Sequence, residues 1–147
     1  MTPKEYLAQG IHLDIIIKNK IDQIADIEAL LTRVSATLSD VKVQTSVDDH
    51  KNEDLIIKML EQREELFDDF DRYARVRKEI KEVINAVDDN DLKLLLEMRY
   101  ITYMKWEEIA DKLGYSIQHV YRLRKKALAR VEKIIQNKNM RVNVIKC

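Results

Sequence analysis

The chain has 147 residues, of which 46% are hydrophobic and 35% charged, and its 26 basic and 26 acidic side chains give a formal net charge of zero. Two glycines and one proline leave few of the turns that a sheet protein needs, so the composition predicts a nearly all-helical fold. The one cysteine, Cys147, cannot form an internal disulfide, which is typical of a reducing compartment. Because the sequence has neither a membrane-length apolar run nor a signal-peptide pattern, we expect a cytoplasmic protein without membrane partners.

The N-terminal half carries two heptad patterns, each typical of a long amphipathic helix. In the first, apolar residues and one lysine recur at alternating steps of four and three: Leu13, Ile17, Lys20, Ile24, Ile27, Leu31, Val34, Leu38 and Val41. The second pattern is weaker and includes two arginines: Ile56, Met59, Arg63, Leu66, Phe70, Tyr73, Arg77, Ile80, Ile84 and Val87. The polar stretch 44–52 separates them. Two long helices with a short connection predict an antiparallel, coiled-coil-like hairpin over residues 1–87.

Further apolar residues beside these patterns give each helix more hydrophobic surface than one partner helix covers. They include Ile16, Ile21, Leu30, Leu55 and Phe67. Two explanations remain open: the rest of the chain covers this surface, or the hairpin forms a homodimer or engages a protein partner such as RNA polymerase. We interpret Lys20, Arg63 and Arg77 as side chains that bury their stems, reach water at the edge and set the register.

The segment 106–131 predicts a helix, a glycine turn and a second helix with a basic outer face, which is the layout of a DNA-reading helix-turn-helix. The first helix places its apolar residues on one side: Trp106, Ile109, Ala110 and Leu113. We expect Gly114 to adopt the left-handed conformation of a helix C-cap and Ser116 to accept a hydrogen bond from the next helix. That helix begins near Ile117 and is expected to bury one stripe: Val120, Leu123, Ala127, Val131 and Ile134.

The opposite side of the second helix presents Gln118, Arg122 and Lys125, flanked by Tyr121 and Lys126. Glutamine pairs with adenine and arginine with guanine in the major groove, whereas lysines near the C-terminal end suit phosphates. The charge distribution favours this interpretation. Residues 1–87 contain 13 basic and 18 acidic residues, net −5, and residues 88–147 contain 13 and 8, net +5.

Residues 91–135 resemble the promoter-reading C-terminal module, region 4, of bacterial sigma factors. The resemblance rests on LLLEMRY at 94–100, WEEIADKLGYS at 106–116 and VYRLRKKAL at 120–128. It implies base contacts from Ile117, Gln118, Tyr121 and Arg122. We assign backbone contacts to Ser116, His119, Lys125, Lys126 and Arg130. A similar module ends a group of small phage regulators, the late-transcription activators and ArpU-like proteins, which this chain resembles more closely in its length and helical N-terminal half.

The pattern predicts three domains: a hairpin for oligomerisation or partner binding at 1–87, a DNA-binding helix-turn-helix domain at 88–136 and a flexible tail at 137–147. The leading interpretation is a sequence-specific transcriptional regulator, phage or prophage encoded, that binds double-stranded DNA at a promoter. A small terminase subunit also joins such a module to oligomerising helices, usually with the DNA-binding part first. A third interpretation is a protein-interaction adaptor whose basic helix contacts an acidic protein surface.

Nothing in the sequence resembles a catalytic or metal-binding motif. His12, His50 and His119 lie far apart, and there is neither a glycine-rich phosphate loop nor a cluster with metal-ligand spacing. We interpret the acidic runs at 68–71 and 87–91 as solvated or helix-capping residues. We therefore expect no enzymatic activity, no cofactor and no bound metal.

Overall fold

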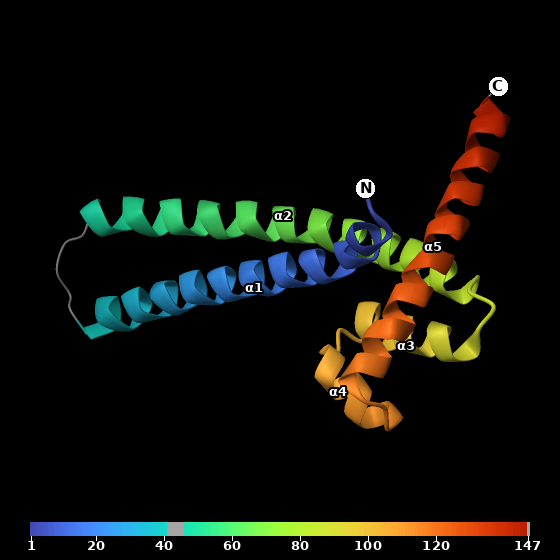
Figure 1. Ribbon diagram of the computed structural model, residues 1–147. Helices are drawn as coiled ribbons and strands as arrows, with labels where there is room; N and C mark the ends of the chain where they lie inside the picture. Colours follow the sequence, from blue (N-terminus) through green and yellow to red (C-terminus); the bar gives the residue numbers. More distant parts are fainter. Residues whose placement is uncertain (41–45, 147) are drawn as a thin grey trace. The chain divides into compact units, whose positions relative to one another are not determined.

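The computed structural model describes the backbone of residues 1–40 and 46–146 and the side chains of residues 1–33 and 50–139 (Figure 1). The helices are α1 (Pro3–Asp40), α2 (Ser46–Asn85), α3 (Asn90–Tyr100), α4 (Trp106–Leu113) and α5 (Ile117–Lys146), and the described residues contain no strand. The predicted all-helical fold is confirmed. The side chains of Val34, Leu38 and Val41, and Cys147 as a whole, lie outside the described residues.

Two helices are longer than predicted. α2 begins at Ser46, so residues 46–52 are helical and do not belong to the connection. Acidic residues follow Ser46 in the sequence, and the helix macrodipole favours them in a first turn. α5 continues to Lys146, so residues 137–146, where a flexible tail is predicted, are helical. No glycine or proline interrupts that stretch, and the helix therefore meets no backbone signal that would end it.

The chain divides into two compact units, which we call the arm and the core unit. The arm comprises Leu13–Arg72, and the core unit comprises Met1–His12 together with Tyr73–Cys147. This division differs from the predicted boundary at residue 87, because Leu7 and buried residues between Ile80 and Val87 belong to one hydrophobic cluster with α3, α4 and α5. The arm carries 8 basic and 15 acidic residues, net −7, and the core unit 18 and 11, net +7.

In the arm, α1 and α2 run in opposite directions. Lys20 pairs with Asp69, and further along α1 Glu28 pairs with Arg63, so the contacts proceed forward on one helix and backward on the other. The buried side of α1 is the predicted one, since Leu13, Ile17, Ile24 and Ile27 are at most 7% exposed and Leu31 is half-buried.

The buried side of α2 corrects the prediction at four alternate positions, from Ile56 to Arg77. Met59, Leu66 and Tyr73 are half-buried as expected, and Ile80, Ile84 and Val87 are buried. The buried positions that alternate with these residues lie one residue earlier in the sequence than predicted. Leu55, Gln62, Asp69 and Val76 are buried or half-buried, whereas the predicted residues are exposed: Ile56, Arg63, Phe70 and Arg77. A search for apolar residues misses this register because two of its members, Gln62 and Asp69, are polar.

The Asp69 carboxylate is tolerated on the buried side of α2 because it is paired with Lys20 of α1. Its ammonium group bonds Asp69, and Glu65 lies 3.6 Å from it. The hydrogen bond to Asp69 raises the pKa of Lys20 above its ordinary value. This pair is consistent with the prediction that Lys20 sets the register of the two helices. Arg63 instead lies outside the seam, where its Nη2 is 2.5 Å from Glu28 Oε1.

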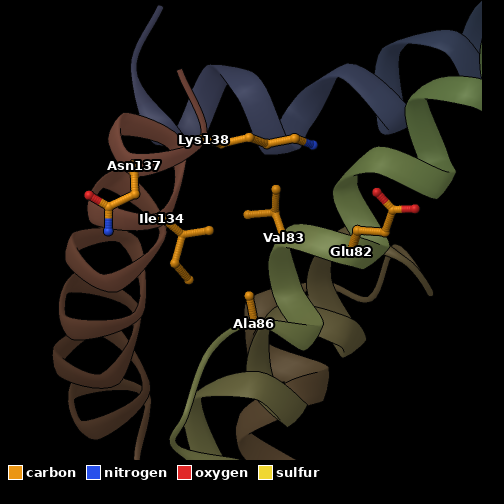
Figure 2. A pocket seen from close by; sticks show the side chains of 6 residues that line it. All are labelled: Glu82, Val83, Ala86, Ile134, Asn137 and Lys138. Atoms are coloured by element: carbon orange, nitrogen blue, oxygen red, sulfur yellow. The ribbon is translucent and has the colours of Figure 1, made fainter. Parts of the chain in front are cut away.

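The core unit is built around one cluster of buried side chains from five helices. They are Leu7, Ile80, Val83, Ile84, Val87, Leu92, Leu95, Leu96, Tyr100, Ile109, Ala110, Val120, Ala127 and Val131. α3 and α4 pack against each other and against α5. Beyond Val131, Ile134 of α5 and Val83 of α2 point toward one another across a hollow whose rim includes Glu82 and Lys138 (Figure 2). None of the described helices combines the length and apolar character needed to span a membrane.

Candidate nucleic-acid interface

α4 is a short amphipathic helix with the predicted buried side. Ile109 and Ala110 are buried, and Trp106 and Leu113 are half-buried and packed against the core cluster. Glu107 and Glu108 are exposed in the first turn, where the macrodipole favours negative charge. The side chain of the N-cap residue, Lys105, makes no capping hydrogen bond.

The turn between α4 and α5 has the predicted geometry. Gly114 is left-handed, with φ 71° and ψ 29°, and its N–H donates to the carbonyls of Ala110 and Asp111. The N–H of Tyr115 also donates to the Ala110 carbonyl, at 3.0 Å. Ser116 Oγ accepts a hydrogen bond from the N–H of His119 at 3.2 Å and so caps the first turn of α5. The expectations for Gly114 and Ser116 are confirmed.

The buried stripe of α5 determines which of its residues face outward. Val120, Ala127 and Val131 are completely buried, and Leu123 and Ile134 are packed against the same cluster. Because one side of a rigid helix is held in this way, the residues half a turn away are held outward. Those residues are the predicted ones, and all are exposed: Gln118, Tyr121, Arg122, Lys125 and Lys126.

A shallow hollow runs along this outer face of α5. It is lined by two apolar residues, Leu123 and Ala129, and by four basic side chains, His119, Arg122, Lys125 and Lys126. The small side chain of Ala129 leaves space between long cationic ones. The surface can therefore approach a polyanion closely while placing several positive charges around it.

The remaining assigned residues lie at the edges of this face. Ile117 is half-buried and packed against the core cluster, so only part of its side chain is available for contact. His119 is half-buried, and its ring meets that of Tyr115 edge-on with centroids 4.7 Å apart. Arg130 is exposed and follows Lys126 by four residues on the same edge. The structure thus brings all nine assigned residues to the N-terminal half of α5 and its cap.

Trp106 organises two arginines that the sequence analysis did not single out. The guanidinium carbons of Arg99 and Arg124 each lie 5.2 Å from the centroid of the indole ring. Arg99 also donates from Nη1 to the Met104 carbonyl at 2.9 Å. Each cation–π contact is worth on the order of 0.5–2 kcal/mol. These contacts tie the end of α3 and the first third of α5 to the start of α4.

Tyr100 also contacts Trp106. Its ring meets Trp106 edge-on, with centroids 6.4 Å apart and an interplanar angle of 79°. Burial raises the pKa of the Tyr100 phenol, against an opposing effect of the nearby arginines. The only sequence signal for this arrangement was the presence of a tryptophan, Trp106, in a basic segment of the chain.

A family model described as "Protein of unknown function (DUF1492)" matches residues 30–132. The match covers more than half of the chain, which therefore belongs to the DUF1492 family. It includes α3, α4, the turn and the exposed face of α5 as far as Arg130. No curated protein and no solved structure matches the chain.

Proposed function

We propose that this chain is a sequence-specific DNA-binding transcriptional regulator, of the kind represented by small phage regulators. In this proposal α4, the turn and α5 form a helix-turn-helix of the sigma region 4 type, and α5 enters the major groove. The observation that carries the proposal is the division of α5 into two faces. Because Val120, Ala127 and Val131 are fully buried, the glutamine, arginine and lysines on the other side face outward together.

The exposed residues differ in what they would contribute. Gln118 and Arg122 lie near the start of α5 and would make bidentate contacts with adenine and guanine, with Tyr121 and the exposed part of Ile117 beside them. Lys125, Lys126 and Arg130 would contact phosphates, together with Ser116 and His119. Phosphate contacts supply affinity and register, while base contacts supply specificity.

The charges of the two units support a division of labour. The core unit, net +7, would be attracted to DNA, and the arm, net −7, would be repelled by it. A single helix-turn-helix makes too few base contacts to select one site in a genome. We propose that the arm, as an antiparallel hairpin, supplies a second contact through RNA polymerase or through another copy of the chain.

A binding experiment on the full chain tests the proposal. Fluorescence anisotropy with a random-sequence duplex at several salt concentrations should show affinity that falls linearly on a double-logarithmic plot. Each phosphate contact contributes about −0.9 to the slope. Lys125→Ala should therefore reduce the steepness by about 0.9. Lys58→Ala, which removes an exposed lysine of the arm, is the matched control and should leave the slope unchanged.

Footprinting on the neighbouring genome segment would then provide a specific site. At that site Arg122→Ala should weaken binding by about 1–3 kcal/mol, with a much smaller effect on random DNA. An Arg122→Ala protein that protects the same site as the parent with equal affinity would refute the assignment of the reading face. Absence of salt-dependent DNA binding would refute the proposed function itself and leave the basic face for an acidic protein.

A further inference from the structure

α2 carries a second apolar stripe within the arm, beside the side that packs against α1. Ile56, Leu60, Phe67 and Phe70 are 42%, 52%, 70% and 43% exposed. With Arg63 between them, their positions alternate in steps of four and three, as in a heptad pattern. Such spacing keeps the residues in one line along a helix and is the pattern that a further helix would pack against.

Two hollows of the arm meet along this stripe. One lies between the helices and is lined by Ile21 and Ala25 of α1 and by Leu66, Phe67 and Phe70 of α2. The other is lined by Ile57, Leu60 and Phe67 and by the charged side chains of Glu61, Arg63 and Glu64. Arg63 and Phe67 belong to both hollows, so the two form one groove, lined mainly by apolar side chains, that reaches from Phe70 to Leu60.

Among the described residues that line this groove, the one cation, Arg63, is paired from within the chain. Arg63 Nη2 lies 2.5 Å from Glu28 Oε1, and Glu28 itself lines the inter-helix hollow. The pair leaves the groove floor apolar without an uncompensated positive charge at its centre. An apolar side chain entering the groove would therefore be received by Phe67, Phe70 and Leu66.

The surroundings of the groove select the charge of the occupant. Glu61 and Glu64 line one end of the groove, Asp68 is exposed beside it on α2, and the arm as a whole has a net charge of −7. A second acidic arm, an anionic lipid surface or DNA would be repelled by these carboxylates. A helix with basic residues on both sides of its apolar face would be attracted.

We propose that this groove is the docking site for an amphipathic helix of another protein, with apolar residues against Leu60, Phe67 and Phe70 and lysines or arginines on its flanks. The incoming helix adds a third member to the two-helix arm and removes its largest exposed apolar side chains from water. The inference rests on the arm alone and not on DNA binding by α5.

The test uses the full chain and two labelled synthetic peptides of amphipathic heptad sequence, one with lysine and one with glutamate at the flanking positions. The lysine peptide should bind in fluorescence anisotropy, and the glutamate peptide should bind at least about tenfold more weakly. Phe67→Ser should weaken binding of the lysine peptide at least about tenfold, since a large aromatic side chain at the centre of a groove is a typical hot spot.

Ile15→Ser is the matched control. Ile15 is 57% exposed on α1 but lines neither hollow, so the variant should bind the peptide as the parent does. Circular dichroism would verify that both variants keep the helical content of the parent. DNA binding by the Phe67→Ser protein should be unchanged, which separates this inference from the function proposed for α5.

Three results would overturn the proposal. Equal binding of the two peptides would remove the role of charge. An unchanged affinity in the Phe67→Ser protein would place the binding site elsewhere. Light scattering that shows a dimer of the parent, dissociated by Phe67→Ser, would assign the groove to a second copy of the chain.

Discussion

Removing one partner of the Lys20–Asp69 pair should destabilise the arm, and the size of the loss gives a quantitative test of the register of the two helices. The Asp69 side chain is 10% exposed and that of Lys20 is 23% exposed. Exposed pairs contribute about 0–1 kcal/mol, whereas loss of one partner of a fully buried pair costs about 3–5 kcal/mol. We expect Lys20→Met to lie between these limits, at about 2 kcal/mol, because it leaves Asp69 without its cation.

Substitution of the other partner, Asp69, should cost less stability. In Asp69→Leu the lysine remains closer to water and keeps Glu65, which lies 3.6 Å away, so we expect a loss of about 1 kcal/mol. The double variant Lys20→Met, Asp69→Leu places two apolar side chains in the seam and should be close to the parent in stability. The coupling between the two positions would then be about 2–3 kcal/mol.

Urea unfolding of the full chain, followed by far-ultraviolet circular dichroism, would measure these differences. Lys18→Met is a matched control, because Lys18 pairs with Asp14 at 2.9 Å on the surface and its side chain is 71% exposed. It should cost less than about 0.5 kcal/mol. Additive effects at positions 20 and 69, with a loss from Lys20→Met no larger than from Lys18→Met, would refute the buried pair and the register that it defines.

The same pair predicts a specific dependence on pH. The pKa of Lys20 is raised above its ordinary value of 10.5, chiefly by the hydrogen bond to Asp69. The stability that this shift contributes is fully present below 10.5 and is lost only as the pH rises through the higher pKa of the folded state. The difference in stability between the parent and Lys20→Met should therefore be constant near neutral pH and shrink in strong alkali.

Two further predictions concern the core unit. Gly114→Ala should destabilise the protein by about 1–2 kcal/mol in urea unfolding, because the residue has φ 71° while nothing within 4 Å would meet the new carbon; an unchanged stability would contradict strain as the reason for glycine. A fragment of residues 88–147 lacks Leu7, Ile80 and Ile84, so we expect little stable helix by circular dichroism, whereas residues 1–12 joined to 73–147 by a glycine-rich linker should fold. A stable 88–147 fragment would show that the cluster does not need α1 and α2.

The local features of α4, the turn after it and α5 were predictable from sequence because each depends on neighbours within a few residues. A glycine after the last apolar residue of α4 is favoured in the left-handed C-cap, and a serine two residues later can cap α5. Helical periodicity alone separated the buried Val120 and Val131 from the exposed Arg122. The contacts of Trp106 were not predictable, since Arg99 and Arg124 reach it from two other helices.

The buried side of α1 was likewise predictable from its heptad pattern. On α2 four positions of the pattern were predicted one residue too late. The sequence by itself determined an all-helical chain, the turn between α4 and α5 and the polarity of α5, because backbone propensity and the 3.6-residue period act locally. Only the tertiary structure decided that Asp69 lies in the seam and that Leu7 and Ile84 share a core with α5. The cost of burying a carboxylate depends on a lysine 49 residues away, and a hydrophobic core is defined by which distant side chains exclude water together.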